Sequence, residues 1–189
     1  MKLDLFDAAG FNRGAPRWRE AMWLVASGLL ISTWLPGSVW RIALLRLFGA
    51  KIGKCVVIKP HVKVKFPWRL SVGNHCWIGE HTWIDNLADV KIGEHVCISQ
   101  GAYLCTGSHD WCSEKFDLIV KPIALEPHVW IGAKSTIGPG CQVGEGAVVA
   151  LGSVALGSLK PWTIYSGVPA TPEKRRTRSH TKAIEAEND

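Results

Sequence analysis

The stretch from Leu125 to Val154 divides into the units LEPHVW, IGAKST, IGPGCQ, VGEGAV and VALGSV. Each unit begins with an aliphatic residue, and Gly or Ala follows it in four of the units. A small residue stands two places before three of the aliphatic ones, at Ser135, Cys141 and Ala147. Six-residue repeats of this kind build parallel β-helices, in which each unit supplies one short strand and one turn. The stretch therefore predicts a solenoid.

The apolar residues of such a repeat are expected to point into the solenoid. A single unit cannot bury its own apolar face, so successive coils must stack on one another. We expect the residue after each aliphatic one to turn the corner, because Gly is tolerated in tight turns. A series of ordinary hairpins would instead need strands of period two and turns of the Asn-Gly type, and the stretch has neither.

The same sixes occur earlier in the chain, with a longer coil. Ile52-Gly53, Val72-Gly73 and Ile92-Gly93 begin three coils, and the register then holds as far as Leu104. No sixes follow until Leu125, which marks an insertion over about residues 105–124. An insertion in a solenoid projects from a corner, where binding residues tend to lie. We expect a β-helix over residues 51–158 and a C-terminal extension with a basic tail over residues 159–189.

Composition limits the possible classes of protein. The chain has 189 residues, of which 47% are hydrophobic and 20% charged, and this excludes general disorder. The net charge is +6, and cations cluster near both ends, at Arg13, Arg17, Arg19, Lys174, Arg175, Arg176, Arg178 and Lys182. Such clusters suit a phosphorylated cofactor, a membrane surface or a nucleic acid, and equally a solvated tail. The 6 cysteines show no zinc-binding spacing, so we expect free thiols in a reducing compartment.

Residues 1–50 are expected to form a helical cap over the open end of the solenoid. Ala21 to Leu35 is almost continuously apolar, Pro36-Gly37 interrupts it, and Val39 to Phe48 has the pattern of an amphipathic helix. A signal peptide lacks a convincing cleavage site here, and a spanning helix needs about 20 apolar residues. A cap fits best, with peripheral membrane contact through a tryptophan-rich face. A helical hairpin dipping into the bilayer is the alternative. The face would contain Trp18, Trp23, Trp34 and Trp40.

Histidines are the candidates for chemistry. His109 stands at the start of the insertion, where a neutral imidazole could act as a general base, and a purely structural surface histidine is the alternative. His61 and His81 share the coil spacing, as do His75 and His95. We expect each pair to stack on the surface, and we expect no metal site.

Four segments resemble the hexapeptide-repeat acyltransferases, and most closely the colanic acid biosynthesis acetyltransferases. They are CTGSHD at Cys105–Asp110, IDN at Ile84–Asn86, ISQGAYL at Ile98–Leu104 and TIYSGVPA at Thr163–Ala170. The resemblance covers roughly residues 10–175. It implies an all-β, left-handed parallel β-helix that assembles as a homotrimer. Acetyl-CoA would lie between neighbouring solenoids.

The resemblance also assigns residues. His109 matches the catalytic histidine, which would take the proton from a sugar hydroxyl as that oxygen attacks the thioester. Asp85 and Asn86 match the region that contacts the acceptor, although Asp and Asn are also common at corners. Ala133 and Leu151 match positions whose backbone contacts the pantetheine arm. Relatives often carry Thr-Lys where this chain has Leu156-Gly157, so the phosphates of acetyl-CoA would meet other cations. The candidates are Lys160, Lys174 and Arg175.

The function that the resemblance implies is an acetyl-CoA-dependent O-acetyltransferase of extracellular polysaccharide biosynthesis. The acceptor would be a sugar or a lipid-linked oligosaccharide, met in the cytoplasm or at the inner face of the cytoplasmic membrane, and no nucleic acid is expected as a partner. Two alternatives stay open at this point. One is a non-catalytic trimeric scaffold at the membrane, and the other is a zinc-dependent hydratase like the hexapeptide-repeat carbonic anhydrases.

Overall fold

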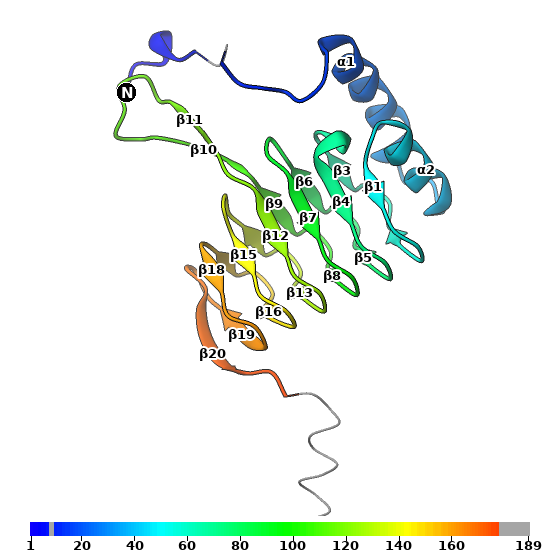
Figure 1. Ribbon diagram of the computed structural model, residues 1–189, viewed down its shortest axis with the longest axis vertical. Helices are drawn as coiled ribbons and strands as arrows, with labels where there is room; N and C mark the ends of the chain where they lie inside the picture. The colour runs from blue at the N-terminus through cyan, green and yellow to red at the C-terminus, as the bar shows by residue number, and fades with distance from the viewer. Residues whose placement is uncertain (8–9, 178–189) are drawn as a thin grey trace, which may run out of the picture.

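The computed structural model describes residues 1–7 and 10–177. Three parallel sheets form the sides of a solenoid, whose coils stack from the helical end to the C-terminal end (Figure 1). Sheet A contains β1 (Lys51–Ile52), β4 (Leu70–Val72), β7 (Val90–Ile92), β12 (Ile123–Leu125), β15 (Gln142–Val143) and β18 (Ser158–Leu159). Sheet B contains β2 (Val57–Ile58), β5 (Trp77–Ile78), β8 (Cys97–Ile98), β13 (Trp130–Ile131), β16 (Val148–Val149) and β19 (Thr163–Ser166), with β20 (Thr171–Arg175) antiparallel to β19. Sheet C contains β3 (Lys63–Val64), β6 (Trp83–Asp85), β9 (Tyr103–Cys105), β14 (Thr136–Ile137) and β17 (Val154–Ala155).

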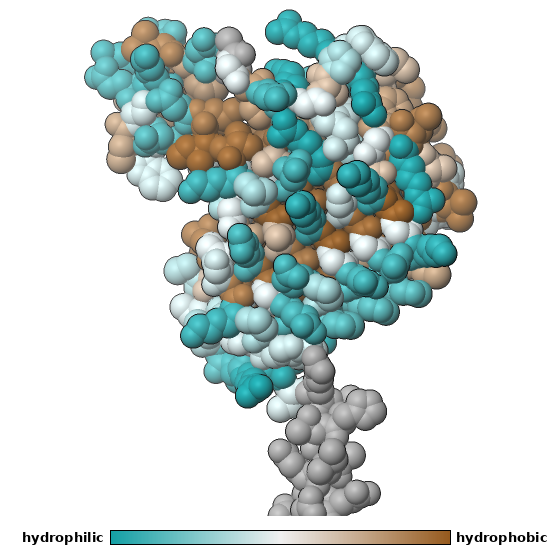
Figure 2. Space-filling view, viewed as in Figure 1, coloured by the Kyte–Doolittle hydropathy of each residue, from teal (hydrophilic) through white to brown (hydrophobic). Residues whose placement is uncertain are grey.

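The core follows the repeat. The aliphatic residues Ile131, Ile137 and Val143 are fully buried, and so are the small residues Cys141 and Ala147. Rows of hydrophobic residues run between hydrophilic ones on the face seen in Figure 2, where sheet A lies toward the viewer. This alternation of inward apolar and outward polar residues is the period-two pattern of a strand with one buried face. The predicted left-handed β-helix of hexapeptide repeats is confirmed.

The glycine after each aliphatic residue has a different role from the predicted one. Gly73 does not adopt a positive φ, and the left-handed conformation falls two residues later, at His75 (φ 57). A Cβ placed on Gly73 would lie only 2.7 Å from the backbone nitrogen of Glu94 in the next coil. Gly73 lies at the corner between β4 and β5 as expected, but the left-handed backbone of the turn is not the reason for a glycine there. It is needed because successive coils approach too closely for a side chain.

The histidine ladders are confirmed. The rings of His61 and His81 stack with centroids 4.6 Å apart, and those of His75 and His95 stack at 4.9 Å. The second ladder continues to His128, whose ring lies 5.2 Å from that of His95. The spacing in the sequence does not reveal His128 as a third member, because the insertion falls between its coil and that of His95.

Helices cover the end of the solenoid at the first coil, so the predicted cap is confirmed (Figure 1). Trp23 is 2% exposed and donates a hydrogen bond from Nε1 to the carbonyl of Val64 at 2.9 Å. Arg41 is fully buried, because its guanidinium donates to backbone carbonyls that precede its own helix, among them that of Thr33 at 3.1 Å. The helical segments are η1 (Leu3–Leu5), α1 (Arg17–Ala26), the π-helical turn η2 (Ser27–Ile31), α2 (Val39–Leu47) and η3 (Pro67–Arg69).

The predicted tryptophan face needs a correction. Trp23 lies in the core and Trp40 is half-buried beneath the guanidinium of Arg41, whereas Trp18 and Trp34 are exposed. Trp23 turns inward because its side chain fills the gap between the cap and the first coil. In the described part of the chain, none of the helices combines the length and apolar character that crossing a bilayer requires. Residues 178–189 of the predicted basic tail lie outside the described residues.

Candidate active site

The insertion leaves the solenoid at the corner between sheets C and A, after β9. It forms an antiparallel hairpin of β10 (Gly107–His109) and β11 (Leu118–Val120), in which His109 faces Leu118. The hairpin projects away from the coils, and the N-terminal segment lies beside it (Figure 1). The backbone nitrogen of Lys2 donates to the carbonyl of Glu114 at 2.8 Å, which ties the two segments together. His109 is thus held outside the regular coils, on a loop that has its own hydrogen bonds.

The imidazole of His109 is oriented by Phe116. Its Nδ1 lies 2.8 Å from the carbonyl oxygen of Phe116. A carbonyl can only accept, so Nδ1 of the neutral ring carries the hydrogen and Nε2 keeps its lone pair. The ring of Phe116 stacks on the imidazole at 4.1 Å, and the ring of Phe6 meets it edge-on at 5.3 Å. This arrangement fixes the tautomer that a general base needs, with the basic nitrogen at Nε2.

Phe116 can play this part because of its unusual backbone. Its φ is 53°, which is rare for a bulky residue without a special reason. The turn before it is closed by side chains, with Ser113 Oγ donating to Asp117 at 2.7 Å and the Cys112 nitrogen donating to Asp110 Oδ1 at 2.9 Å. Sequence reasoning missed Phe116 and Phe6, since neither belongs to a repeat or a recognised motif.

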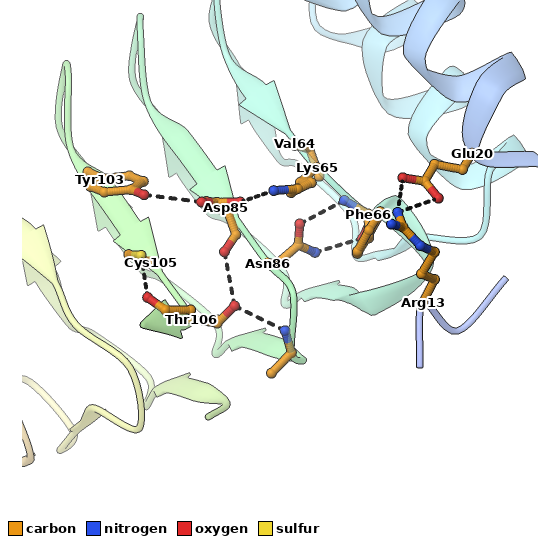
Figure 3. Close-up of polar contacts among 12 residues, drawn as sticks. Arg13, Glu20, Val64, Lys65, Phe66, Asp85, Asn86, Tyr103, Cys105 and Thr106 are labelled. Atoms are coloured by element: carbon orange, nitrogen blue, oxygen red, sulfur yellow. Dashed lines mark hydrogen bonds and ion pairs between the residues drawn. The ribbon is translucent and has the colours of Figure 1, made fainter. Parts of the chain in front are cut away.

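Asp85 lies at the end of β6, on the outer side of sheet C, and its carboxylate accepts a hydrogen bond from the hydroxyl of Tyr103 at 3.1 Å (Figure 3). Lys65 Nζ lies 3.2 Å from Oδ1 as an ion pair, yet no hydrogen bond of normal geometry reaches that buried oxygen. Burial, followed by the neighbouring Cys105 and Asp85, raises the pKa of Tyr103 far above its usual range, so its hydroxyl stays a donor. Oδ1 of Asp85 therefore accepts no hydrogen bond but has less than 1 Å² of exposed surface, so a ligand hydroxyl would reach it only where Lys65 moves aside.

Asn86 is placed differently from its neighbour in sequence. Its side chain is fully buried. Its Oδ1 accepts from the backbone nitrogen of Phe66 at 2.9 Å, and its Nδ2 donates to the carbonyl of the same residue at 2.6 Å. Both ends of the amide are thus used to join one coil to the preceding one (Figure 3). The structure gives Asn86 no surface on which to meet an acceptor.

The candidate cofactor residues fall into three places. Ala133 and Leu151 stack at the corner between sheets B and C, where the nitrogen of Gly152 donates to the carbonyl of Ala133 at 2.8 Å. Leu151 is 75% exposed. The cations do not share this corner within one chain, because Lys160 lies between sheets A and B, and Lys174 and Arg175 lie on the exposed strand β20.

The structure also bears on metals and thiols. Within residues 1–7 and 10–177, no group of three His, Cys, Asp or Glu side chains is arranged to hold a metal ion. The histidines stack ring on ring instead of converging on one point. All the cysteines are free thiols, among them Cys105 at the foot of the hairpin.

Comparisons with known proteins agree with this geometry. No protein-family model matches the chain. The chain is 37% identical over 180 residues to the WcaF protein of Escherichia coli K12, which is named as a colanic acid biosynthesis acetyltransferase, and the match covers 92% of this chain and 98% of that protein. It is 25% identical to the galactoside O-acetyltransferase of the same organism, over 68% of this chain and 65% of that protein.

Solved structures show the same fold. The hexapeptide-repeat acetyltransferase VCA0836 of Vibrio cholerae, in its complex with acetyl coenzyme A, superimposes with a TM-score of 0.77 and 26% identity over 92% of this chain and 93% of that one. The structure of VCA0836 without that ligand in its name gives the same TM-score of 0.77 with 28% identity, over 87% and 96% of the two chains. Because the sequence match to WcaF spans almost the full length of both proteins, the chain belongs to the hexapeptide-repeat acetyltransferases, in the family of the colanic acid biosynthesis acetyltransferases.

Proposed function

We propose that the protein transfers the acetyl group of acetyl-CoA to a hydroxyl of a sugar, with His109 as the general base. The observation that carries this proposal is the hydrogen bond between His109 Nδ1 and the carbonyl of Phe116 at 2.8 Å, since it leaves Nε2 as the basic nitrogen. The relationship to WcaF and the acetyl coenzyme A complex of VCA0836 support the choice of acetyl donor.

The proposed reaction is a direct transfer. Nε2 of His109 takes the proton of the sugar hydroxyl while that oxygen attacks the acetyl carbonyl carbon. When the tetrahedral intermediate collapses, the carbon–sulfur bond breaks and the thiolate of CoA leaves. The imidazolium then returns its proton to the sulfur, so the products are the O-acetylated sugar and CoA. Asp85 supports this step by accepting a hydrogen bond from a second hydroxyl of the acceptor, which would hold the sugar in place.

Acetyl-CoA is proposed to run along the corner between sheets B and C. At this corner Ala133 is half-buried and Leu151 is exposed, and their backbone groups not already bonded, as the Ala133 carbonyl is to Gly152, would meet the pantetheine arm. Lys160, Lys174 and Arg175 are exposed cations suited to the phosphates, and they would reach the arm from a neighbouring subunit, because they lie away from that corner in their own chain.

A homotrimer is part of the proposal. The outward residues of sheet B are almost all apolar, and Trp77 and Trp130 are 42% and 49% exposed in the isolated chain. A continuous apolar face of this kind marks an interaction surface. Its outward residues in strand order are Val57, Trp77, Cys97, Trp130, Val148 and Ile164.

The acceptor is proposed to belong to extracellular polysaccharide assembly, as a free sugar unit or a lipid-linked oligosaccharide. The name of WcaF supports this, and so does the surface of the cap. Hydrophobic side chains gather over α1 and α2 (Figure 2), and Leu24, Trp34 and Val39 are each more than 70% exposed. We propose that this surface touches the cytoplasmic face of the membrane, where acetyl-CoA and the growing saccharide can meet.

The test separates catalysis from binding. In calorimetry with EDTA present, acetyl-CoA should bind at about one site per chain. His109→Ala should then bind acetyl-CoA normally but lower turnover by roughly 10²-fold or more. His128→Asn is the matched control, because Asn tolerates the left-handed backbone of this surface ladder residue, and it should keep normal turnover. A folded trimer that binds no acetyl-CoA would favour the scaffold function, and normal turnover in His109→Ala would remove His109 from the mechanism.

A further inference from the structure

A cleft of about 420 Å³ lies between α1 and the end of β3, at the helical end of the solenoid. None of the residues discussed for acetyl-CoA line it. The cleft has an apolar wall on one side and a charged rim on the other. The lining residues that carry the argument are Arg13, Arg17, Glu20, Leu24 and Lys65.

The charged rim has an excess of positive charge. Arg13 is paired with Glu20 at 2.7 Å, and Lys65 is paired with Asp85 at 3.2 Å (Figure 3). Arg17 is exposed, and no hydrogen-bond or ion-pair partner is found for it among the described residues. The two ion pairs balance, so Arg17 leaves the rim with an excess of one positive charge, which favours an anionic ligand. Guanidinium and ammonium groups both suit the oxygens of a phosphate.

Lys65 joins this cleft to the proposed acceptor site. Its ammonium contacts Oδ1 of Asp85, the buried carboxylate oxygen that accepts no hydrogen bond in this structure. A ligand that places a hydroxyl at Asp85 would therefore bring its neighbouring substituent to Lys65 and the cleft beyond. The anionic group that the cleft can hold is therefore a substituent of the acceptor itself.

The apolar wall continues onto the outer surface of the cap. Trp23, Val64 and Phe66 form the floor, and Leu24 stands at the edge with 72% of its surface exposed. Leu24 is followed by Val25, which is 60% exposed. A ligand can thus leave the cationic rim along a hydrophobic surface, as the chain of a lipid phosphate would.

We propose that this cleft binds the phosphate of a glycosyl phosphate or glycosyl diphosphate acceptor, with Arg17 and Lys65 supplying the positive charge. This inference rests on the proposed sugar acetylation and names the chemical class of its acceptor. The phosphate of such an acceptor belongs either to a lipid carrier or to a nucleotide. The apolar wall favours the lipid.

The cleft is separate from the corner assigned to acetyl-CoA. It lies beside β3, whereas Ala133 precedes β14, and β6 and β9 stand between these two strands in sheet C. Neighbouring strands are about 4.8 Å apart, so the two places are separated by roughly 14 Å along the solenoid. The diphosphate of acetyl-CoA and the phosphate of the acceptor can then be held at the same time.

The experiment measures binding of inorganic pyrophosphate to the full chain by calorimetry, in metal-free buffer and with saturating acetyl-CoA. Arg17→Ala and Lys65→Met should each weaken the affinity by about tenfold, as expected for the loss of one charge-assisted contact. Lys63→Met is the matched control, because Lys63 is an exposed cation two residues earlier that does not line the cleft. It should change the affinity by less than about twofold.

Two further probes identify the source of the phosphate. Farnesyl diphosphate should bind more tightly than pyrophosphate if the acceptor is lipid-linked, and uridine diphosphate should do so if it is a nucleotide sugar. The inference is overturned if none of the three probes binds, if Lys63→Met weakens binding as much as Lys65→Met, or if saturating acetyl-CoA abolishes pyrophosphate binding. Acetyl-CoA affinity, measured on the same variants, reports on the proposed function independently.

Discussion

Two corners of the same solenoid differ in how much they vary. The corner between sheets B and C has four residues in every coil, with the left-handed conformation always at the third, as at His61 and Gly152. The corner between sheets C and A changes from coil to coil, and it holds the short helix η3, the buried Asn86 and the whole hairpin with His109. The parallel ladders fix the strands but leave one corner free to accept insertions. The side chains suited to chemistry gather at this variable corner.

The hairpin at the variable corner depends on the backbone of one residue, and this gives the largest expected effect. Phe116→Pro cannot keep a φ of 53°, because the proline ring holds φ near −65°. The carbonyl would turn away from His109 Nδ1 and the basic tautomer would lose its support. Turnover should fall by roughly 10²-fold, close to the loss expected for His109→Ala. Steady-state kinetics measure this, with the melting temperature as the check on folding.

Phe116→Asn separates the carbonyl from the ring. Asn tolerates the left-handed conformation, so the carbonyl stays in place while the stacked ring is lost. Turnover should fall by no more than about tenfold, in line with the modest energy of one aromatic contact. Equal losses in the two variants would show that the ring, and not the backbone, positions His109.

The difference between the corners also explains what could be predicted from sequence. The coils, their register and the His61–His81 stack followed from spacing, because each strand pairs with an identical unit one coil away. His109 was found because it stands where the sixes stop. Phe116 and Phe6 could not be found, since they reach His109 through the fold of the hairpin and of the N-terminal segment, which no repeat encodes.

Asn86 and Asp85 are adjacent in sequence but should respond differently to mutation. Asn86→Ala leaves the backbone nitrogen of Phe66 buried and without its partner, whereas the carbonyl of Phe66 keeps its hydrogen bond from the Arg69 nitrogen at 3.0 Å. The free energy of unfolding should fall by about 2 kcal/mol, the cost of one unsatisfied buried group and one lost hydrogen bond. Urea denaturation measures this. Asp85→Asn can still accept from Tyr103 and should mainly raise the KM for the acceptor, so a similar loss of stability in both variants would contradict the distinction.

The regular corners can be tested through two kinds of glycine. Gly73→Ala places a Cβ 2.7 Å from backbone atoms of the next coil, and it should cost about 2 kcal/mol of unfolding free energy as an overpacked site. Gly152 has open space around its Cβ position but a φ of 69°, so Gly152→Ala should cost about 1 kcal/mol. Asn should restore stability at residue 152 and not at residue 73. If Asn restored the unfolding free energy at both positions, both glycines would be needed only for their backbone conformation, and not for the close approach of the coils.

The smallest expected effects concern two thiols at the corner between sheets C and A, one in the hairpin and one in an unbroken coil. Cys112 is exposed in the hairpin, whereas Cys141 is buried where a later coil turns the same corner without an insertion, and burial raises the pKa of the Cys141 thiol to about 11 from its ordinary value of 9.0. Cys112 should react with a thiol reagent at neutral pH, and Cys141 only after unfolding. Because the unfolded chain loses this proton at a lower pH, the contribution of Cys141 to stability is complete below pH 9 and is lost as the pH rises to about 11. Between pH 9 and 11, the unfolding free energy of the unchanged protein should therefore fall by about 2 kcal/mol more than that of Cys141→Ala. If the two unfolding free energies changed in parallel with pH, the Cys141 thiol would not be shielded from solvent.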